Sequence, residues 1–515
     1  MSSDGIMRRG EGFEFEIPYI DAVHFDQFPG VMAREALIAG QRPPALDEPF
    51  IYCDMGCGTG ATILMLAASF PESHFYGVDL SADHINHAEA NRLATGIENA
   101  TFFQGSFERA AQGGVPPCDF ISAHGILSWI PEAVETELLT AVQSLLKPGG
   151  LFQLSANLQP GWGQMSPLRQ IMRHHIAHAE GNAEDRLLSA IGKTAALVSN
   201  ENNSFGGKNP DAKGITGNWR NREAAYVGHE MLGGAWRHFS VGEVMRLCKG
   251  FGLECCGPLA SAGRQNDEKI ASFEIDSTET ETLEDFMSFS AGEGFRSLVF
   301  TKPENEEFER SEMELLGDDV LGFPVFACWS VWAPEPKEPL SEWTLQFDDQ
   351  PHYLARIMAE AASGAIPGAE FAAVAHFVGS ALMARNALIY ADTARDVETE
   401  NCSEFSFEAP HPLTAHVLAQ PRTYRYGGFV PSPILGGGVS LSPVRAALLG
   451  AFLDNSTDKL AYARAIIAKM DAKAPPWALE DPDRALPDPA DEIDDFTRDW
   501  LPFLLRLGVI QAQSV

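Results

Sequence analysis

The sequence predicts an α/β fold built on a doubly wound parallel sheet with helices on both faces. Between residues 50 and 155, short apolar runs alternate with stretches of helical apolar spacing, which is typical of strand–helix–strand units. The first apolar run leads directly into a glycine-rich loop and then into a helix. At 515 residues the chain exceeds what one hydrophobic core usually serves, so we expect two or three domains.

Seven strands are expected, each an apolar run of strand length. They cover Phe50–Asp54, Phe75–Asp79, Asn99–Gln104, Cys118–Ala123, Leu151–Ser155, Leu253–Pro258 and Phe295–Thr301. Helical spacing of apolar residues predicts helices between the first five strands, at Ala61–Phe70, Ala82–Ala94 and Glu132–Leu146. Together these elements predict a sheet domain over residues 1–305.

The apolar pattern changes after Pro160, where we expect a helical insertion over about residues 160–240. Its helices are predicted at Met165–Ala179, Arg186–Val198 and Arg222–Phe251, and a loop rich in Asn and Gly is predicted at Glu201–Asn221. A middle domain over 306–395 and a C-terminal domain over 396–515 follow. The C-terminal domain has predicted helices at Ser442–Phe452 and Asp458–Met470, and a stretch rich in Pro and Asp, Ala474–Asp495, that should be exposed.

The composition narrows the classes of function. The formal net charge of −34 gives a surface that repels nucleic acid and anionic lipid, so no nucleic-acid partner is expected. The start of the chain lacks the apolar stretch of a secretion signal, and no run of about 18 apolar residues predicts a membrane span. The eight cysteines include no CxxC pair, which disfavours zinc and fits a reducing cytoplasm.

The strongest chemical signal is the loop that opens with Asp54 and contains Gly56, Gly58 and Gly60. Glycines let the backbone turn sharply and approach a ligand closely, and the helix behind the loop offers amide donors. Asp79 ends the next strand, where a carboxylate can accept both hydroxyls of a ribose. The pattern predicts a nucleoside-ligand site, with a purely structural glycine turn as the alternative.

Two ligands compete for this loop. A dinucleotide fold needs G-x-G-x-x-G against a pyrophosphate, whereas this loop reads D-x-G-x-G-x-G. The carboxylate of Asp54 would repel a pyrophosphate but can accept the ammonium of an amino-acid tail. The loop therefore favours S-adenosylmethionine over NAD.

The adenine ring of such a ligand would lie near the end of the third strand. Ser106 and Phe107 follow that strand, and Leu80 follows Asp79, so we expect these side chains or their backbone to contact the nucleoside. Ser106 can accept or donate a hydrogen bond at the edge of the adenine. An ordinary turn at the strand end is the alternative for Ser106.

From Phe50 to Ser155 the chain resembles the class I methyltransferases, which bind S-adenosylmethionine in a Rossmann-like fold. A narrower resemblance is to methyltransferases with a regulatory domain, which include bacterial protein-lysine methyltransferases acting on outer-membrane proteins. It rests on Ala123–Pro131, Asn157–Trp162, Tyr226–Glu230, Tyr19, Phe25–Pro29 and Phe295-Arg296, and residues 411–470 are similar to that group's winged-helix-like C-terminal module.

This resemblance implies S-adenosylmethionine as cofactor, a lysine of a protein as methyl acceptor, and a dimer interface in the helical insertion. The chain departs from the family at Ala156, where the family has a Tyr between Ser and Asn. The hydroxyl of that Tyr is therefore absent beside the cofactor, which bears on the acceptor and on activity.

Three residues are predicted to form the acceptor slot. His124 follows the fourth strand, at the edge where a doubly wound sheet binds its ligands, and is expected to contact acceptor or cofactor. Trp129, with Trp162, can wall the slot or stack on a cation. Asn157 can hydrogen-bond the acceptor. The alternatives are a histidine that satisfies loop backbone, tryptophans that anchor the insertion, and a turn cap.

Tyr19 and Gln27 are predicted to form a lid over the cofactor. No metal site is expected. His174, His175 and His178 lie on one predicted helix, but no third ligand of suitable spacing accompanies the pair that shares a face.

The sequence therefore predicts an S-adenosylmethionine-dependent methyltransferase whose acceptor is a protein lysine. Two other functions stay open. One is methylation of a small metabolite enclosed by the accessory domains. The other is a regulatory protein that binds the cofactor without turnover, which the Ala156 departure keeps open.

Overall fold

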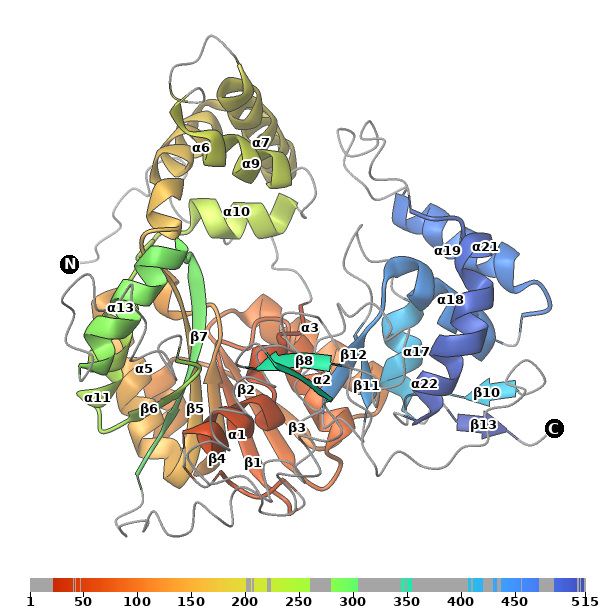
Figure 1. Ribbon diagram of the computed structural model, residues 1–515, viewed down its shortest axis with the longest axis horizontal. Coiled ribbons are helices and arrows are strands. Elements are labelled where there is room, and N and C mark those ends of the chain that lie inside the picture. Colours follow the sequence, from red (N-terminus) through yellow and green to blue (C-terminus); the bar gives the residue numbers. More distant parts are fainter. Residues whose placement is uncertain are drawn as a thin grey trace.

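A computed structural model describes residues 22–259 and 279–303 with short gaps at 40, 42, 47, 201–204, 206–207 and 220–223. It also describes two short strands, at 344–347 and 350–353, and much of residues 406–513. A sheet domain, a helical lobe above it and a C-terminal helical region beside it make up the described molecule (Figure 1). The predicted middle domain falls almost entirely outside the described residues.

The sheet has seven strands in the order β3-β2-β1-β4-β5-β7-β6. Their bounds are β1 Ile51–Met55, β2 His74–Asp79, β3 Ala100–Gln104, β4 Cys118–Ala123, β5 Leu146–Asn157, β6 Glu254–Gly257 and β7 Phe295–Thr301. This order reverses between β1 and β4, so the crevice of a doubly wound sheet lies at the carboxyl ends of these two strands. The predicted seven-stranded, Rossmann-like fold is confirmed.

The sheet is mixed rather than purely parallel, because β7 runs antiparallel to both β5 and β6. To run parallel to β5, a following strand must begin at the amino end of β5, so the chain before it must cross the whole length of the sheet. Helix α13 (Thr280–Ala291) instead ends at Gly292, and backbone hydrogen bonds from Leu158 to Gly294 and from Gly161 to Glu293 hold the chain at the edge where β5 ends. The next strand can only run back along β5.

Helices cover both faces of the sheet because side chains alternate along its strands. Tyr52 and Phe75 belong to the core on one face, with helices α1 (Pro29–Ile38) and α2 (Ala61–Ser69). Cys53 and Val78 belong to the core on the other face, with α5 (Glu132–Leu145) and α11 (Val241–Lys249). Helix α3 (Ala82–Thr95) links β2 to β3, and the short α4 (Phe107–Arg109) follows β3.

The insertion forms a lobe of its own above the sheet (Figure 1). It contains α6 (Ser166–His178), α7 (Ala183–Ser199), α9 (Pro210–Trp219) and α10 (Ala224–Leu232), which share a separate apolar core. The loop predicted at Glu201–Asn221 is thus partly wrong, because Ala212, Thr216 and Trp219 are buried on one face of α9. The Gly and Asn residues of this segment are typical of loops, so the helical spacing of Ala212, Thr216 and Trp219 is hard to recognise in the sequence.

The segment Arg222–Phe251, for which helical spacing is predicted, contains two helices, α10 and α11. The chain leaves helical conformation at Gly233 and Gly234, where glycine lowers helix stability. Ser240 then starts α11 with a capping box, in which its side chain and that of Glu243 each bond the other's backbone amide.

The C-terminal region packs against the sheet domain rather than standing apart. Its helices are α17 (Pro412–Ala419), α18 (Pro443–Leu453), α19 (Lys459–Asp471), α21 (Pro489–Asp495) and α22 (Leu501–Arg506), and its strands pair β11 (Phe429–Ser432) with β12 (Gly437–Ser440) and β10 (Ser406–Glu408) with β13 (Gln511–Gln513). Val430 and Leu448 share one apolar core with Ile63 of α2. A boundary at 396 and a winged-helix-like module remain predictions.

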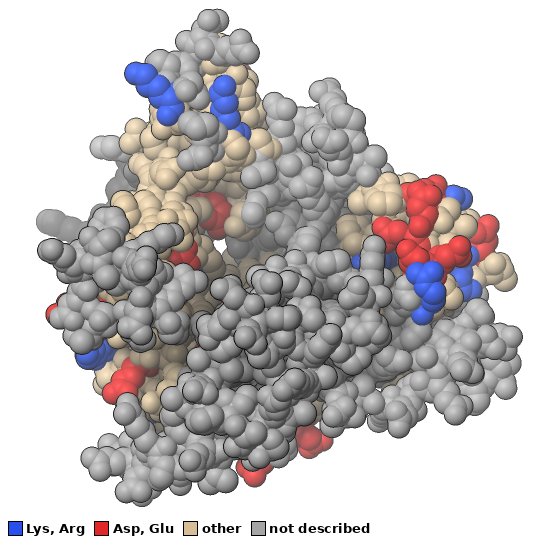
Figure 2. All heavy atoms as spheres, in the orientation of Figure 1, with Lys and Arg blue, Asp and Glu red and all other residues tan. Residues whose placement is uncertain are grey.

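Charge is unevenly spread over the described surface. Asp491, Asp494 and Asp495 are exposed on α21, and both acidic and basic side chains are visible over this end of the molecule, where Arg464 pairs with Asp488 and Arg498 with Asp495 (Figure 2). Helix α21 is also part of the stretch Ala474–Asp495 that is predicted to be exposed. Among the described helices, none combines the length and the apolar character that a membrane crossing requires.

Candidate functional site

The carboxyl ends of β1, β2, β4 and β5 bring four predicted site residues to one edge of the sheet. Asp54 lies in β1, Asp79 ends β2, His124 follows β4 and Asn157 ends β5. We call the ends of β1 and β2 the cofactor side, and the ends of β4 and β5 the acceptor side. The parallel pairing of β1 with β2 and β4 makes the two sides neighbours.

The glycine loop is held in a left-handed conformation that suits only glycine. Gly56, Gly58 and Gly60 have φ values of 95°, 54° and 76°. A Cβ atom on Gly56 would lie 2.2 Å from Cδ1 of Ile126, and one on Gly60 would lie 2.6 Å from the Phe102 ring. The loop therefore packs closely against Ile126 and Phe102, and it places the N-terminus of α2 at the carboxyl ends of the strands.

Asp79 fastens this loop to β2. Its Oδ2 accepts the Gly58 amide at 2.9 Å, and its Oδ1 accepts the Ser81 amide at 2.8 Å and lies 3.3 Å from Nδ1 of His84. The hydrogen bond to Asp79 raises the pKa of His84. Leu80, next in the chain, is 71% exposed.

Asp54 lies deeper than Asp79, and its surroundings oppose its charge. Its Oδ1 accepts hydrogen bonds from Nε2 of Gln27 at 2.9 Å and from Oγ of Ser122 at 2.8 Å. Burial nevertheless raises the pKa of the Asp54 carboxyl to about 6, against the opposing effect of both hydrogen bonds. Gln27 thus braces the acid that opens the glycine loop, from a position near the start of the chain.

Ser106 and Phe107 both have structural contacts in the described chain. The Ser106 hydroxyl caps α4 by accepting the Arg109 amide at 3.4 Å. Phe107 is half-buried and packs against the core under β4. Contact of either residue with a nucleoside stays a prediction.

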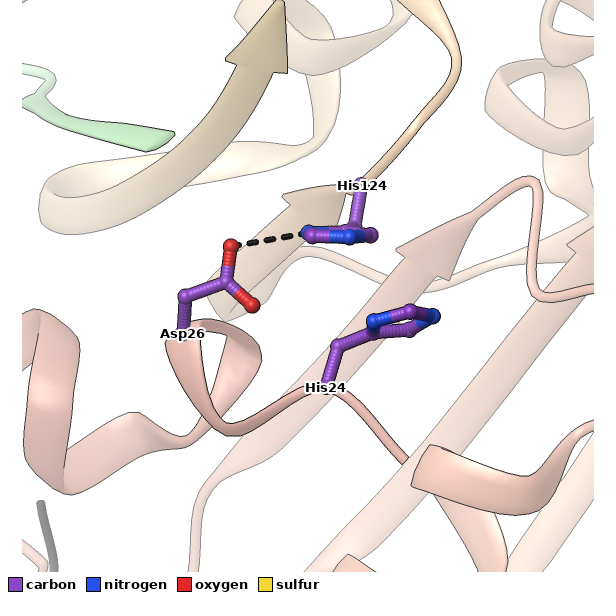
Figure 3. A group of neighbouring side chains, drawn as sticks. All are labelled: His24, Asp26 and His124. Atoms are coloured by element: carbon purple, nitrogen blue, oxygen red, sulfur yellow. Dashed lines mark hydrogen bonds and ion pairs between the residues drawn. The ribbon is translucent and has the colours of Figure 1, made fainter. Parts of the chain in front are cut away.

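The acceptor side holds a cluster that residue patterns did not reveal (Figure 3). Nδ1 of His124 lies 2.8 Å from Oδ2 of Asp26, and the His24 ring stacks on the His124 ring with centroids 3.9 Å apart. Asp26 also accepts from Nε2 of Gln153 at 3.2 Å, and Gln153 donates to Oγ of Ser297 at 2.7 Å.

Electrostatics divides the roles within this cluster. Burial and the neighbouring His124 together lower the pKa of His24 to about 3, against the opposing charge of Asp26. Burial would also lower the pKa of His124, but the charge and hydrogen bond of Asp26 outweigh it and raise it. Burial would raise the pKa of Asp26, but His124 and His24 lower it to about 2. Asp26 is therefore ionised and His24 is neutral, whereas the charge of Asp26 favours the protonated form of His124.

The predicted tryptophans lie at the base of the insertion. Trp129 meets Trp162 edge to face at 6.2 Å, and Trp162 meets Trp236 at 6.0 Å. This row favours the alternative that the tryptophans anchor the insertion. Asn157 is 5% exposed, and its Nδ2 is a buried donor without a hydrogen-bond partner in the described chain, which is compatible with an absent polar ligand.

Ala156, where the family has a Tyr, is buried beside these groups. It is 3% exposed, lies in the core with Leu154 and Leu158, and pairs with Arg296 of β7. The Ala156 side chain offers no polar group to a ligand. Phe295, which pairs with Asn157, is 43% exposed at the same edge.

Sequence reasoning missed His24, Asp26 and Gln153. His24, Asp26 and Gln27 are polar residues set around Phe25 and directly before Phe28, and Gln153 is a polar residue between Phe152 and Leu154 in a predicted strand; both patterns were usable signals. Tyr19 lies outside the described residues. Gln27 is 2% exposed and bonded to Asp54.

A family model described as a methyltransferase domain matches residues 53–152. An uncharacterised protein of Synechocystis, sll1526, is 28% identical over 240 residues, 47% of each chain. A malonyl-[acyl-carrier protein] O-methyltransferase of Halalkalibacterium halodurans is 33% identical over 121 residues, 23% of this chain and 43% of that protein. The chain thus spans about half the length of these curated relatives.

A solved structure with the same fold is titled as PKMT2 from Rickettsia typhi in complex with AdoHcy. The superposition covers 96% of this chain and 100% of that one, with 17% sequence identity and a TM-score of 0.63. Residues 53–152 of this chain therefore belong to a methyltransferase domain, built on the class I, Rossmann-like fold.

Proposed function

We propose that this chain transfers methyl groups from S-adenosylmethionine to lysine side chains of proteins. The observation that carries the proposal is the pair of acids on the cofactor side, Asp54 at the glycine loop and Asp79 at the end of β2. It is supported by the methyltransferase domain and by the AdoHcy bound in the structure titled PKMT2.

The cofactor side suits each part of this nucleoside. Asp54 would accept the ammonium of the methionine tail. Each oxygen of Asp79 already accepts one backbone amide, from Gly58 or Ser81, and would accept the ribose hydroxyls with its remaining lone pair. The exposed Leu80 would cover one face of the adenine, with Ser106 and Phe107 at its edge. When bound, S-adenosylmethionine supplies an electrophilic methyl group on a sulfonium.

The acceptor side suits a cation that must lose a proton before it reacts. Phe25 and Phe295 are 39% and 43% exposed beside the histidine cluster, and aromatic faces attract ammonium groups. Asp26 adds a negative charge there, and the acidic surface of α21 would attract basic proteins. The resemblance to protein-lysine methyltransferases and the name PKMT2 agree with this choice of acceptor.

Methylation of a small molecule is the second candidate. The likeness to a trans-aconitate 2-methyltransferase of Methylobacterium nodulans, 30% identical over 158 residues, favours it, since the acceptor in that name is a small carboxylic acid. A cofactor-binding protein without turnover is the third candidate, because Ala156 lacks the hydroxyl that the family has beside the cofactor.

Two experiments test the proposal in sequence. Calorimetry with the full chain should show micromolar binding of S-adenosylhomocysteine, which Asp79→Asn should weaken at least tenfold and the exposed neighbour Asp83→Asn should leave unchanged. Incubation with methyl-labelled cofactor and bacterial extract should then label protein bands. Label confined to small molecules supports the second candidate, whereas cofactor binding without label supports the third.

We also propose that the protein works in a reducing cytoplasm and that it forms a dimer. The described cysteines are all free thiols, which agrees with a reducing cytoplasm. The lobe of α6, α7, α9 and α10 is where the family resemblance places a dimer interface. Light scattering of the full chain, compared with a variant altered on α7 at the exposed Leu197, tests that dimer.

A further inference from the structure

The cluster of His24, Asp26 and His124 lies at the carboxyl edge of the sheet, beside the ends of β4 and β5. The side chains of Asp26 and His124 are 15% and 14% exposed, so both are held against the sheet rather than free in solvent. They come from segments far apart in the sequence, the turn before α1 and the end of β4.

One short turn connects this cluster to the cofactor side. In the 3-10 turn Phe25–Gln27, Asp26 points to His124 while the next residue, Gln27, bonds Asp54 of the glycine loop. The turn is fixed by the Tyr52 hydroxyl, which donates to the Gln27 carbonyl at 2.8 Å, and by the His24 amide, which donates to Oγ1 of Thr62 at 3.2 Å. The 3-10 turn therefore fixes the position of Asp26 relative to the glycine loop.

A metal ion is the first alternative for this cluster, because each residue offers a ligand atom and these atoms all lie within 4.8 Å of one another. The ring geometry opposes it. The lone pair of an imidazole lies in the ring plane, and the planes of His24 and His124 are stacked, inclined by only 24°. Two stacked rings cannot both direct a lone pair at one ion about 2 Å away. The Asp26 carboxylate is also already engaged by Nδ1 of His124.

We propose that Asp26 and His124 form the proton-accepting pair of methyl transfer, with His124 as the catalytic base and Asp26 as its positioning residue. The inference rests on the proposed function. The hydrogen bond to Asp26 keeps the proton of neutral His124 on Nδ1 and leaves Nε2 as the accepting nitrogen. The neutral His24 ring, stacked against His124, fixes the plane of that base.

The step balances in atoms and charge. Nε2 of His124 takes one proton from the ε-ammonium of the acceptor lysine, which leaves a neutral amine with a lone pair. That lone pair attacks the methyl carbon of the sulfonium; a C–N bond forms as the C–S bond breaks. The products are a methylated ammonium and the neutral thioether S-adenosylhomocysteine. The proton on His124 then passes to solvent.

The charges around His124 set the pH at which it can act. The groups that face it are Asp26 and His24 from the turn, Asp54 from β1 and Glu230 from α10, and the three acids favour its protonated form. Neutral His124, the form that accepts a proton, therefore becomes the major form only above the ordinary histidine pKa of 6.5. The methylation rate should rise with pH through this range.

The test uses the full chain with methyl-labelled cofactor, and with poly-L-lysine and bacterial protein extract as acceptors. His124→Gln should lower kcat by about 10²- to 10⁴-fold, the usual contribution of a general base, with affinity for S-adenosylhomocysteine within about twofold. Asp26→Asn keeps an oxygen that can accept from His124 but removes the charge, so it should lower kcat and move the acidic limb of the pH profile to lower pH. His74→Gln, at the opposite edge of the sheet, should change neither.

The outcomes separate the two proposals. Suppose that the wild type is active and that Asp26→Asn does not move the acidic limb of its pH–rate profile. The proton-accepting pair is then overturned, but lysine methylation is not, because a limb set by the lysine itself would not depend on Asp26. A wild type that binds S-adenosylhomocysteine but labels neither acceptor overturns lysine methylation, and the pair with it. Stoichiometric zinc that chelation removes together with activity would establish the metal alternative instead.

Discussion

At the carboxyl edge of the sheet, the glycine loop and the two acids at the ends of β1 and β2 come from one stretch of chain, although Gln27 and Ser122 also bond Asp54. The polar groups at the ends of β4 and β5 come from segments far apart in the sequence. Asp54 and Asp79 flank a loop and helix that are continuous in sequence. On the acceptor side, Asp26 reaches His124 across 98 positions and Gln153 across 127. The cofactor side is thus a local motif, and the acceptor side is a product of the tertiary fold.

This difference predicts that the acceptor side can be damaged while the cofactor side survives. Arg296 of β7 is 9% exposed and forms ion pairs with the buried Glu284 and with Glu293. Arg296→Met should lower the free energy of unfolding by about 3–5 kcal/mol, because it removes the cation from a buried carboxylate. Urea unfolding measures the loss, while affinity for S-adenosylhomocysteine should change less than threefold.

The paired variant Arg296→Met/Glu284→Gln serves as the control, since it removes the buried charge as well and should recover part of the stability. Equal stability of the single and paired variants would show that the ion pair is not what supports this edge.

On the cofactor side, a single methyl group should disturb both fold and binding. Gly56→Ala combines a φ of +95° with a 2.2 Å approach to Ile126, so we expect a loss of roughly 2–4 kcal/mol and at least tenfold weaker binding of S-adenosylhomocysteine. Gly96→Ala is the matched control, because its φ is +66° but nothing lies within 4 Å. It should cost about 1 kcal/mol and keep full affinity. Equal effects of the two variants would contradict the tight loop.

The buried Asp54 should make cofactor binding depend on pH. Since the pKa of its carboxyl is raised to about 6, the ionised form that accepts an ammonium grows about tenfold between pH 5 and 7. The association constant for S-adenosylhomocysteine should rise by about that factor in calorimetry. The opposite sign holds for folding, since a raised carboxyl pKa contributes stability at low pH that is lost as pH rises through about 6. In Asp54→Asn both trends should vanish.

The smallest effect is expected for His84, whose ring contacts Asp79 from outside the loop. Its raised pKa contributes stability that is present below pH 6.5 and lost as pH rises through the folded pKa. Because the pair is 22% and 14% exposed, His84→Gln should cost less than about 1 kcal/mol at pH 5.5 and nothing at pH 8.5. A larger loss at pH 8.5 than at pH 5.5 would rule out the ion pair as its cause.

The same division explains what could be predicted from the sequence. The strands, the glycine loop and Asp79 follow from short-range patterns, in which apolar runs, glycines and strand ends lie close together in the chain. The antiparallel β7 could not be predicted, because its direction depends on where α13 stops in space. The role of Gln27 also needed the fold, since its partner Asp54 lies 27 positions away. Local patterns carry no information about such pairs.

The most direct test of this account is a crystal structure of the full chain with S-adenosylhomocysteine. We predict that the nucleoside lies at the ends of β1 and β2, its ribose on Asp79, its amino-acid tail toward Asp54 and its adenine against Leu80. The sulfur should then face His124. A complex in which this crevice is empty, or in which the nucleoside binds elsewhere, would contradict the account.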